Sequence, residues 1–209
     1  MTIQTRRARQ KALLRQEIID AARDILVREG YEQLSMRKVA EKIEYSPTAI
    51  YLHFEDKRDL VFQVCEETFG KLVGELASLD AEFKDPVARL REGLRRYVAF
   101  GLRHPQNYLA TFVAVPQEQL PEDIARYNSP ESNGMRALGI MRAGVVACID
   151  AGVFRTVDPD VTIRALWASV HGITALLIQM PNFGWGDQKA VIDCLLDTLL
   201  EGLKLRRRR

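Results

Sequence analysis

Residue types that build disulfide frameworks, metal centres and catalytic sites are scarce in this 209-residue sequence. Its three cysteines, Cys65, Cys148 and Cys194, lie far apart without metal-ligand spacing, so we expect reduced, structural thiols, a cytoplasmic protein and no metal site. The three histidines accompany no nucleophile motif, and no glycine-rich phosphate loop is present. These absences argue against an enzyme and against a bound cofactor.

Long apolar runs are also lacking. No stretch of about 18 apolar residues occurs, so no segment is expected to span a membrane. Residues 1–7 lack the apolar core of a signal peptide. The hydrophobic share of 47% and the charged share of 28% are ordinary for a globular protein, and the length suffices for one or two domains with a buried core.

The small net charge of +2 hides an uneven distribution, because basic residues gather at both ends of the chain. Residues 1–15 contain five basic residues and no acid, and the last four residues are Arg206–Arg209. We treat Arg6–Arg15 as an arm before the first helix that could reach a minor groove or phosphates. Such contacts fade with added salt, whereas the alternative is a solvated end that binds nothing.

Helical periodicity dominates the sequence, while strand-like alternation and internal repeats are absent. From Ala12 to Glu29 apolar residues recur every three or four positions, and Gly30 follows as a C-terminal cap. Further amphipathic stretches run over about 58–79, 87–102, 135–151, 159–180 and 187–205. Breakers such as Asp85-Pro86 and Asp158-Pro159 separate them. The fold class is therefore predicted to be all-α.

Residues 31–57 predict two short helices joined by a tight turn. Ser35 can cap the first helix, and Ser46-Pro47 provides an N-cap serine and a proline at the first position of the second. The inward-facing residues expected from the two helices are Met36, Val39, Ala40, Ile43, Ile50 and Phe54. Packed against the long helix before them, they form a helix-turn-helix, whose second helix lies in the DNA major groove.

This stretch, about residues 14–62, resembles the DNA-binding domain of the tetracycline-repressor (TetR) family. The resemblance rests on a combination of residues: Gly30-Tyr31, Ser35, Val39-Ala40, Ser46, Ile50-Tyr51, His53-Phe54, Lys57 and Leu60. It implies a three-helix DNA-binding domain over 1–60 and a helical effector-binding and dimerisation domain over 61–209. The implied function is a repressor that binds palindromic operator DNA as a homodimer and is released by a small-molecule effector. A ligand-dependent activator or co-repressed regulator of the same family is the alternative.

The resemblance also implies roles for particular residues. Those expected to contact backbone phosphate are Ser35, Arg37, Tyr51, His53 and Lys57. Those expected to face base edges are Ser46, Thr48 and Ala49. Phosphate contacts set the register, while base contacts specify sequence. For Phe54 plain core packing is the favoured interpretation, and for Tyr51 a packed ring with an outward hydroxyl is compatible with both roles.

The motif departs from the family pattern at three positions. Glu44 stands in the turn where the family often has glycine, and a glutamate with positive φ costs about 1 kcal/mol. Ser46-Pro47-Thr48-Ala49 replaces the common Ser-x-Gly-Thr, and Ala49 offers only a methyl group, which suits a thymine methyl. The operator sequence therefore cannot be transferred from relatives.

The C-terminal part is similar to a subgroup with a Trp-x-x-x-His-Gly signature, here Trp167, His171 and Gly172. A four-residue spacing puts Trp167 and His171 on one helix face, and Gly172 allows close helix approach or room for a ligand. Candidate residues of an effector pocket are Tyr97, Phe100, His104, Tyr108, Phe112, Met141, Val145, Trp167 and His171. For each of these alone, ordinary core packing is the alternative.

The last two long stretches, about 159–180 and 187–205, are expected to form the dimer interface. Its apolar residues are Ile173, Leu176, Leu177, Met180, Val191, Leu195, Leu196, Leu199 and Leu203, with burial inside one subunit as the alternative. Effector binding would favour a conformation whose recognition helices are wrongly spaced for DNA, with the helix from about Arg58 to Leu79 as the lever. The competing classes are an enzyme, a nonspecific architectural DNA binder and a regulator that needs its ligand to bind DNA.

Overall fold

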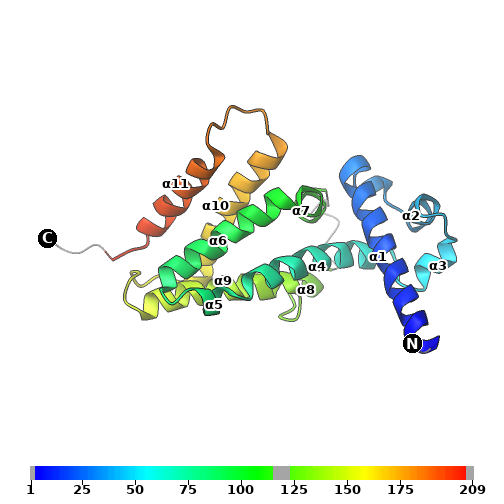
Figure 1. Ribbon diagram of the computed structural model, residues 1–209, viewed down its shortest axis with the longest axis horizontal. Helices are drawn as coiled ribbons and strands as arrows, with labels where there is room; N and C mark the ends of the chain where they lie inside the picture. The colour runs from blue at the N-terminus through cyan, green and yellow to red at the C-terminus, as the bar shows by residue number, and fades with distance from the viewer. Residues whose placement is uncertain (1–2, 115–122, 206–209) are drawn as a thin grey trace. The chain divides into compact units, whose positions relative to one another are not determined.

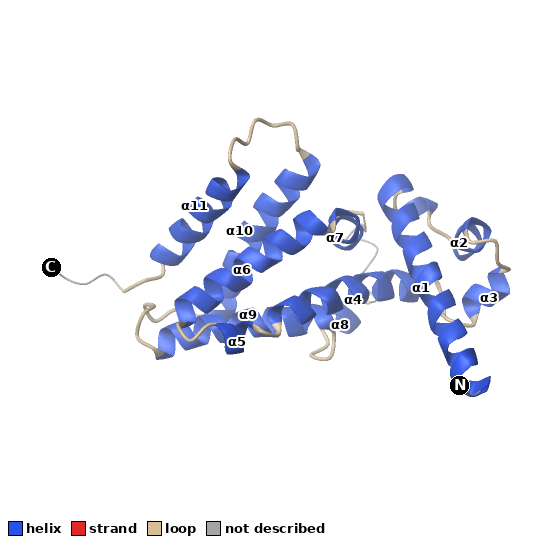
Figure 2. Cartoon of the chain, in the orientation of Figure 1, coloured by secondary structure: helices blue, strands red, loops and turns tan. Residues whose placement is uncertain are grey.

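The computed structural model describes residues 3–114 and 123–205. Within them the chain is built of helices without a strand, apart from one isolated bridge between Phe154 and Lys204 (Figures 1 and 2). This confirms the predicted all-α class. The basic tail Arg206–Arg209 lies outside the described residues.

The chain divides into two compact units. The first joins Met1–Thr68 with Gln106–Ser129, and the second joins Phe69–Pro105 with Pro130–Arg209. Helix α4 (Lys57–Leu76) begins in the first unit and ends in the second. Because these units are defined by packing, the functional division expected after residue 60 stays a prediction.

The first unit contains the predicted helix-turn-helix. Its helices are α1 (Ile3–Glu29), the 3-10 turn Tyr31–Gln33, α2 (Met36–Lys42), α3 (Pro47–Tyr51), the start of α4, α7 (Pro105–Phe112, from Gln106 on) and α8 (Ile124–Tyr127). Apolar side chains of α1 to α4 and Ala110 of α7 form one buried cluster. Gly30 adopts φ 89° directly after α1, so it ends the helix as predicted.

Helix α1 corrects the prediction of an N-terminal arm. It begins at Ile3 rather than near Ala12, so Arg6–Arg15 lie within a helix and not before one. The physical reason is local propensity: arginine, lysine, glutamine, alanine and leucine are strong helix formers, and no glycine or proline interrupts residues 3–29.

The second unit is a bundle around α6 (Pro86–Arg103), α9 (Asn133–Asp150) and α10 (Pro159–Gln179), with α5 (Leu79–Glu82) and α11 (Gln188–Glu201) packed on α6. The dipeptides Asp85-Pro86 and Asp158-Pro159 separate the helices as predicted, and each also starts the helix that follows. The Asp85 and Asp158 carboxylates accept hydrogen bonds from backbone N–H groups, and a proline follows each. The short helices α7 and α8 were not predicted.

Among the described helices, α10 is long and apolar enough to cross a membrane on length and composition alone. A helix in the core of a protein passes the same test. Only 33% of this window is buried in the chain, so α10 presents an apolar face that the chain itself leaves uncovered.

Candidate functional site

Helix α2 is held by a capped start and a fully buried inner face. The Ser35 hydroxyl accepts a hydrogen bond from the Lys38 backbone N–H at 3.2 Å, as predicted. Val39 and Ala40 are completely buried, and Ala40 supplies the small side chain that lets α2 and α3 approach closely. Ile43 at the end of the helix is partly buried against the same core.

The turn after α2 has the geometry that the departure at Glu44 suggested. Glu44 adopts φ 61°, in the left-handed region that favours glycine. The Tyr45 N–H donates to the Ala40 carbonyl at 3.0 Å, and the Glu44 N–H donates to the Glu41 carbonyl at 3.3 Å. These two bonds form a Schellman motif, so the turn is made correctly but with a strained residue.

Helix α3 is short and is fixed in place by its two ends. The Ser46 hydroxyl accepts from the Ala49 backbone N–H at 3.3 Å, and Pro47 occupies the first helical position. Ile50 is completely buried, and Phe54 just after the helix is almost so. The outer side of α3 presents Thr48 and Tyr51 to solvent. The recognition helix predicted from the sequence therefore has a rigid inner side and an accessible outer side.

The eight residues predicted to bind DNA all lie in the first unit and fall into two groups. Ser35, Arg37, Ser46, Thr48 and Tyr51 are exposed, whereas Ala49, His53 and Lys57 are half-buried. The two serine hydroxyls already accept helix-capping bonds, and Arg37 pairs with Glu41 at 2.9 Å. The Tyr51 side chain is 56% exposed, so its ring is not held in the core.

His53 and Lys57 are held more tightly than the sequence suggested. His53 Nδ1 is buried without a hydrogen-bond partner, and burial lowers the pKa of its imidazole, with a further contribution from nearby Lys11 and Arg15. Lys57 Nζ lies 3.8 Å from the centre of the Tyr31 ring, and burial lowers its pKa. Both groups are placed beside the recognition helix with incomplete solvation.

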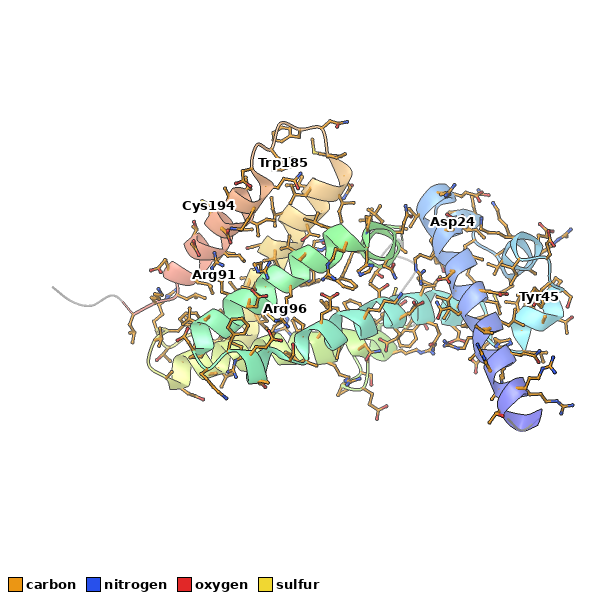
Figure 3. All side chains as sticks on the ribbon, in the orientation of Figure 1. Asp24, Tyr45, Arg91, Arg96, Trp185 and Cys194 are labelled. Atoms are coloured by element: carbon orange, nitrogen blue, oxygen red, sulfur yellow. The ribbon has the colours of Figure 1, made fainter. Side chains whose placement is uncertain are left out.

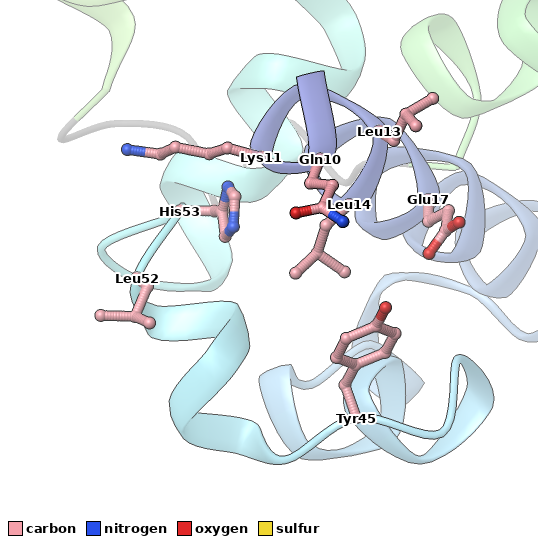
Figure 4. A pocket seen from close by; sticks show the side chains of 8 residues that line it. All are labelled: Gln10, Lys11, Leu13, Leu14, Glu17, Tyr45, Leu52 and His53. Atoms are coloured by element: carbon pink, nitrogen blue, oxygen red, sulfur yellow. The ribbon is translucent and has the colours of Figure 1, made fainter. Parts of the chain in front are cut away.

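A hollow of about 620 Å³ opens between the N-terminal half of α1 and the loops flanking α3 (Figure 4). Its lining residues are Gln10, Lys11, Leu13, Leu14, Glu17, Tyr45, Leu52 and His53. Of these, only His53 was predicted as a site residue. Tyr45 and Leu52 are large side chains left exposed on either side of α3, and Leu52 is 73% exposed. The sequence signal that could have identified Tyr45 and Leu52 is their position next to the predicted recognition helix.

Ion pairs connect helix α2 to helix α1. Asp24 on α1 contacts Lys42 at the end of α2 at 2.6 Å and Arg28 on its own helix at 2.5 Å (Figure 3). The hydrogen bond from Lys42 lowers the pKa of Asp24, and Arg28 adds to this effect. Lys38 pairs with Glu29 in the same way. Being partly exposed, each pair is worth about 0–1 kcal/mol, so burial rather than charge holds the motif.

In the second unit the structure brings together three of the predicted effector residues. Trp167 Nε1 donates to the Tyr97 hydroxyl at 3.2 Å, and the same hydroxyl lies 3.3 Å from His171 Nδ1. Indole N–H can only donate, so the Tyr97 hydroxyl accepts from Trp167, while the tautomer of His171 sets which of Tyr97 and His171 donates to the other. Burial lowers the pKa of His171, which favours its neutral form.

The other effector candidates are divided between the two units. Phe100 and His104 have ring centres 5.0 Å apart on the second unit, and Val145 is completely buried. The Met141 sulfur lies where a side chain at Gly93 would stand, at 2.8 Å from the ideal Cβ position. Tyr108 and Phe112 form a ring pair at 4.8 Å, but they belong to the first unit.

The histidine-glycine signature has room beside it. A Cβ placed on Gly172 would meet no described atom outside its own helix within 4 Å, so close packing against another described helix does not explain this glycine. Within residues 3–114 and 123–205 no group of histidine, cysteine, aspartate and glutamate side chains is arranged to hold a metal ion.

The capped α2–turn–α3 arrangement, anchored on a longer α1, defines a DNA-binding transcriptional regulator of the helix-turn-helix class, which is not an enzyme class. A family model described as "Bacterial regulatory proteins, tetR family" matches residues 18–64. A second, "Tetracyclin repressor-like, C-terminal domain", matches residues 90–202, more than half of the chain. The chain therefore belongs to the TetR family.

Individual relatives agree with this assignment. An HTH-type transcriptional regulator of Saccharopolyspora erythraea is 29% identical over 163 residues, which cover 78% of this chain but 66%, just under two thirds, of the relative. The fatty acid degradation regulator FadR of Bacillus halodurans shares the fold, with a TM-score of 0.75 at 19% identity, covering 92% of this chain and 97% of that one. FadR of Bacillus subtilis, solved in complex with stearoyl-CoA, has a TM-score of 0.75 at 18% identity, covering 90% and 98%.

Proposed function

We propose that this TetR-family protein is a homodimeric repressor that binds a two-fold symmetric operator and is released by a small-molecule effector. The first unit would read DNA through α3, and the second would dimerise and bind the effector. Helix α4, which belongs to both units, would link the two events. The subgroup with the Trp-x-x-x-His-Gly signature stays part of this proposal.

The observation that carries the DNA-binding role is the two-sided construction of α3. Ile50 and Phe54 anchor its inner side in the core, while Thr48 and Ala49 of its first turn remain accessible. The N-terminal residues of a recognition helix are those that meet base edges in the major groove. Thr48 offers a hydroxyl and Ala49 a methyl group, so a thymine near Ala49 is the expected preference.

The uncovered face of α10 supports a dimer. Val161, Ala165, Ala168, Leu176 and Met180 are exposed, and their spacings of three, four and eight residues place them on one face. Gly172 lies in the same row with open space above its Cα atom. An exposed apolar row of this kind is typical of a protein interface, and its small central residues permit close approach of a second helix.

The predicted interface residues need one correction. Leu177 and Leu196 are buried inside the chain, at 4% and 0% exposure, so they serve the core and not a subunit contact. Leu176 and Met180 are 44% and 46% exposed and remain available. Adjacent positions on a helix differ by about 100°, which is why Leu176 faces outward while Leu177 faces inward.

For effector recognition, the Trp167, Tyr97 and His171 cluster is the best supported of the predicted residues. Two hydrogen bonds join the three side chains, so the cluster holds polar groups at defined positions. The stearoyl-CoA complex of Bacillus subtilis FadR makes acyl-CoA the first ligand to test, by calorimetry and by release of bound DNA.

Selection of bound sites from random DNA by the purified chain tests the proposed function. Recovery of a palindromic consensus supports specific dimeric readout. Recovery of no consensus contradicts it, and equal affinity for all sequences would indicate a nonspecific architectural protein. Binding that appears only when ligand is added would indicate the activator or co-repressed alternative.

A further inference from the structure

The N-terminal half of α1 extends beyond the packed part of the first unit. Every side chain from Thr5 to Leu13 is exposed, and the first buried residue of the helix is Ile18. The segment contains Arg6, Arg7, Arg9 and Lys11 and no acid. Helix α1 is therefore longer than its contacts with the buried core require.

One row of basic side chains on this extension continues inward to a residue that packs on the first unit. Arg7, Lys11 and Arg15 recur at four-residue spacing, so they lie in one row along the helix. Arg15, the inner end of the row, stacks its guanidinium 5.2 Å from the centre of the Phe54 ring and donates to Gln63 at 2.5 Å. Arg9, two residues from both Arg7 and Lys11, points to the opposite side at about 100° per residue.

Lys11, in the exposed part of this row, lies near the end of the recognition helix α3. Lys11 lines the same hollow as Leu52 and His53, which follow α3 directly (Figure 4). His53 contributes a buried Nδ1 atom without a hydrogen-bond partner. The first turn of α1 has no acidic residue. The cationic side chains near this helix N-terminus therefore interact unfavourably with the positive end of the helix dipole. A polyanion on this side offsets the unfavourable positive charge at the N-terminus of α1.

We propose that Arg7 and Lys11 of α1 bind the sugar-phosphate backbone of DNA beside the groove that α3 reads. The inference rests on the proposed DNA-binding function and adds a second contact to it. A helix with its side chains is about 10–12 Å across, whereas the minor groove is about 6 Å wide. The helical segment therefore follows the backbone and does not enter the minor groove. It adds affinity without reading sequence.

The salt dependence of DNA binding tests the contact. The probes are a duplex carrying the selected site and a random-sequence duplex of equal length. Each phosphate contact contributes about 0.9 to the slope of log affinity against log salt, so Arg7→Gln with Lys11→Gln lowers the slope by about 1.8 per bound subunit. Between about 50 and 200 mM salt, the wild type then loses roughly 12-fold more affinity per subunit than this variant.

Two further variants make the test specific. Arg6→Gln with Arg9→Gln removes the same charge from other sides of the helix and keeps the wild-type slope. Arg7→Lys with Lys11→Arg preserves charge and also keeps it. Equal slopes for the two glutamine double variants, whether both lowered or both unchanged, overturn the proposal, provided that circular dichroism shows equal helix content.

Failure of the inference is separable from failure of the proposed function. A palindromic consensus with unchanged slopes for Arg7→Gln and Lys11→Gln refutes only the α1 contact. Absence of any consensus refutes specific readout, yet the random-sequence duplex still reports whether the row on α1 binds phosphate.

Discussion

The two units of this protein use apolar surface in opposite ways. In the first unit the helices α1 to α4 bury their apolar residues in one cluster and leave polar and aromatic groups around α3 exposed. In the second unit α10 exposes much of its apolar surface, and its half-buried His171 is hydrogen-bonded to the buried Tyr97 of α6. Complete packing of the first unit fits the proposed role of its outer side in DNA binding, and the uncovered apolar face of α10 fits the proposed contact with a second copy of the chain.

The largest expected effect comes from removing the anchor of the recognition helix. Phe54→Ala deletes a buried ring and should lower the free energy of unfolding by about 3–5 kcal/mol. DNA binding should be lost while the helices of the second unit persist. Urea unfolding followed by circular dichroism measures this, with Leu196→Ala as the matched control in the second unit. Loss of the whole fold in one step would show that the two units are not independent.

A smaller effect is expected from the polar cluster of the second unit. Tyr97→Phe removes the hydroxyl that joins Trp167 and His171, and the unpaired groups should cost about 1–3 kcal/mol. Effector binding should weaken while affinity for DNA without effector is unchanged. Unchanged calorimetric affinity for an identified effector would remove this cluster from the effector site.

The turn of the first unit offers a gain in stability. Glu44→Gly replaces a residue held at φ 61° and should stabilise the chain by about 1 kcal/mol. Glu41→Gly, in the last turn of α2, is the matched control and should destabilise the chain by a similar amount. Thermal unfolding of both variants tests whether the backbone at Glu44 is strained. Destabilisation by Glu44→Gly would contradict the presence of this strain.

The smallest effect concerns pH and His53. Burial first, and then Lys11 and Arg15, keep the pKa of folded His53 below its usual value of 6.5. The unfolded chain therefore binds a proton more readily, and stability should fall as pH drops below about 6.5 toward the lowered folded pKa. His53→Gln should flatten this part of the pH profile in urea unfolding. Glu17, which lines the same hollow, is a carboxylate whose replacement serves as the control.

Local sequence signals correctly predicted where the helices of the helix-turn-helix begin and end. Ser35 and Ser46-Pro47 start their helices where expected, Gly30 ends α1, and Phe54 packs in the core. Capping and glycine termination depend on a few neighbouring residues, so they can be read without knowing the fold. The resemblance to the family raised the case of a positive φ at Glu44, where relatives often have glycine, and Glu44 adopts φ 61°.

Features set by partners distant in the sequence were not predictable in this way. Periodicity could not separate the buried Leu177 from the exposed Leu176, since both are apolar and adjacent. Nor could it place Tyr97 between Trp167 and His171, which lie 70 and 74 residues further along the chain. The hollow beside α3 joins residues of α1 to Tyr45 and Leu52, and no local pattern marks it.

The sequence by itself determined the helical class, the family and the ends of the helix-turn-helix, because capping, propensity and periodicity act over a few residues. Tertiary structure decided which side of each helix is covered. It turned a basic arm into one row on α1 that continues toward the recognition helix, and it left an apolar row on α10 uncovered. Burial depends on which helices pack together, and that packing is settled only when the whole unit folds.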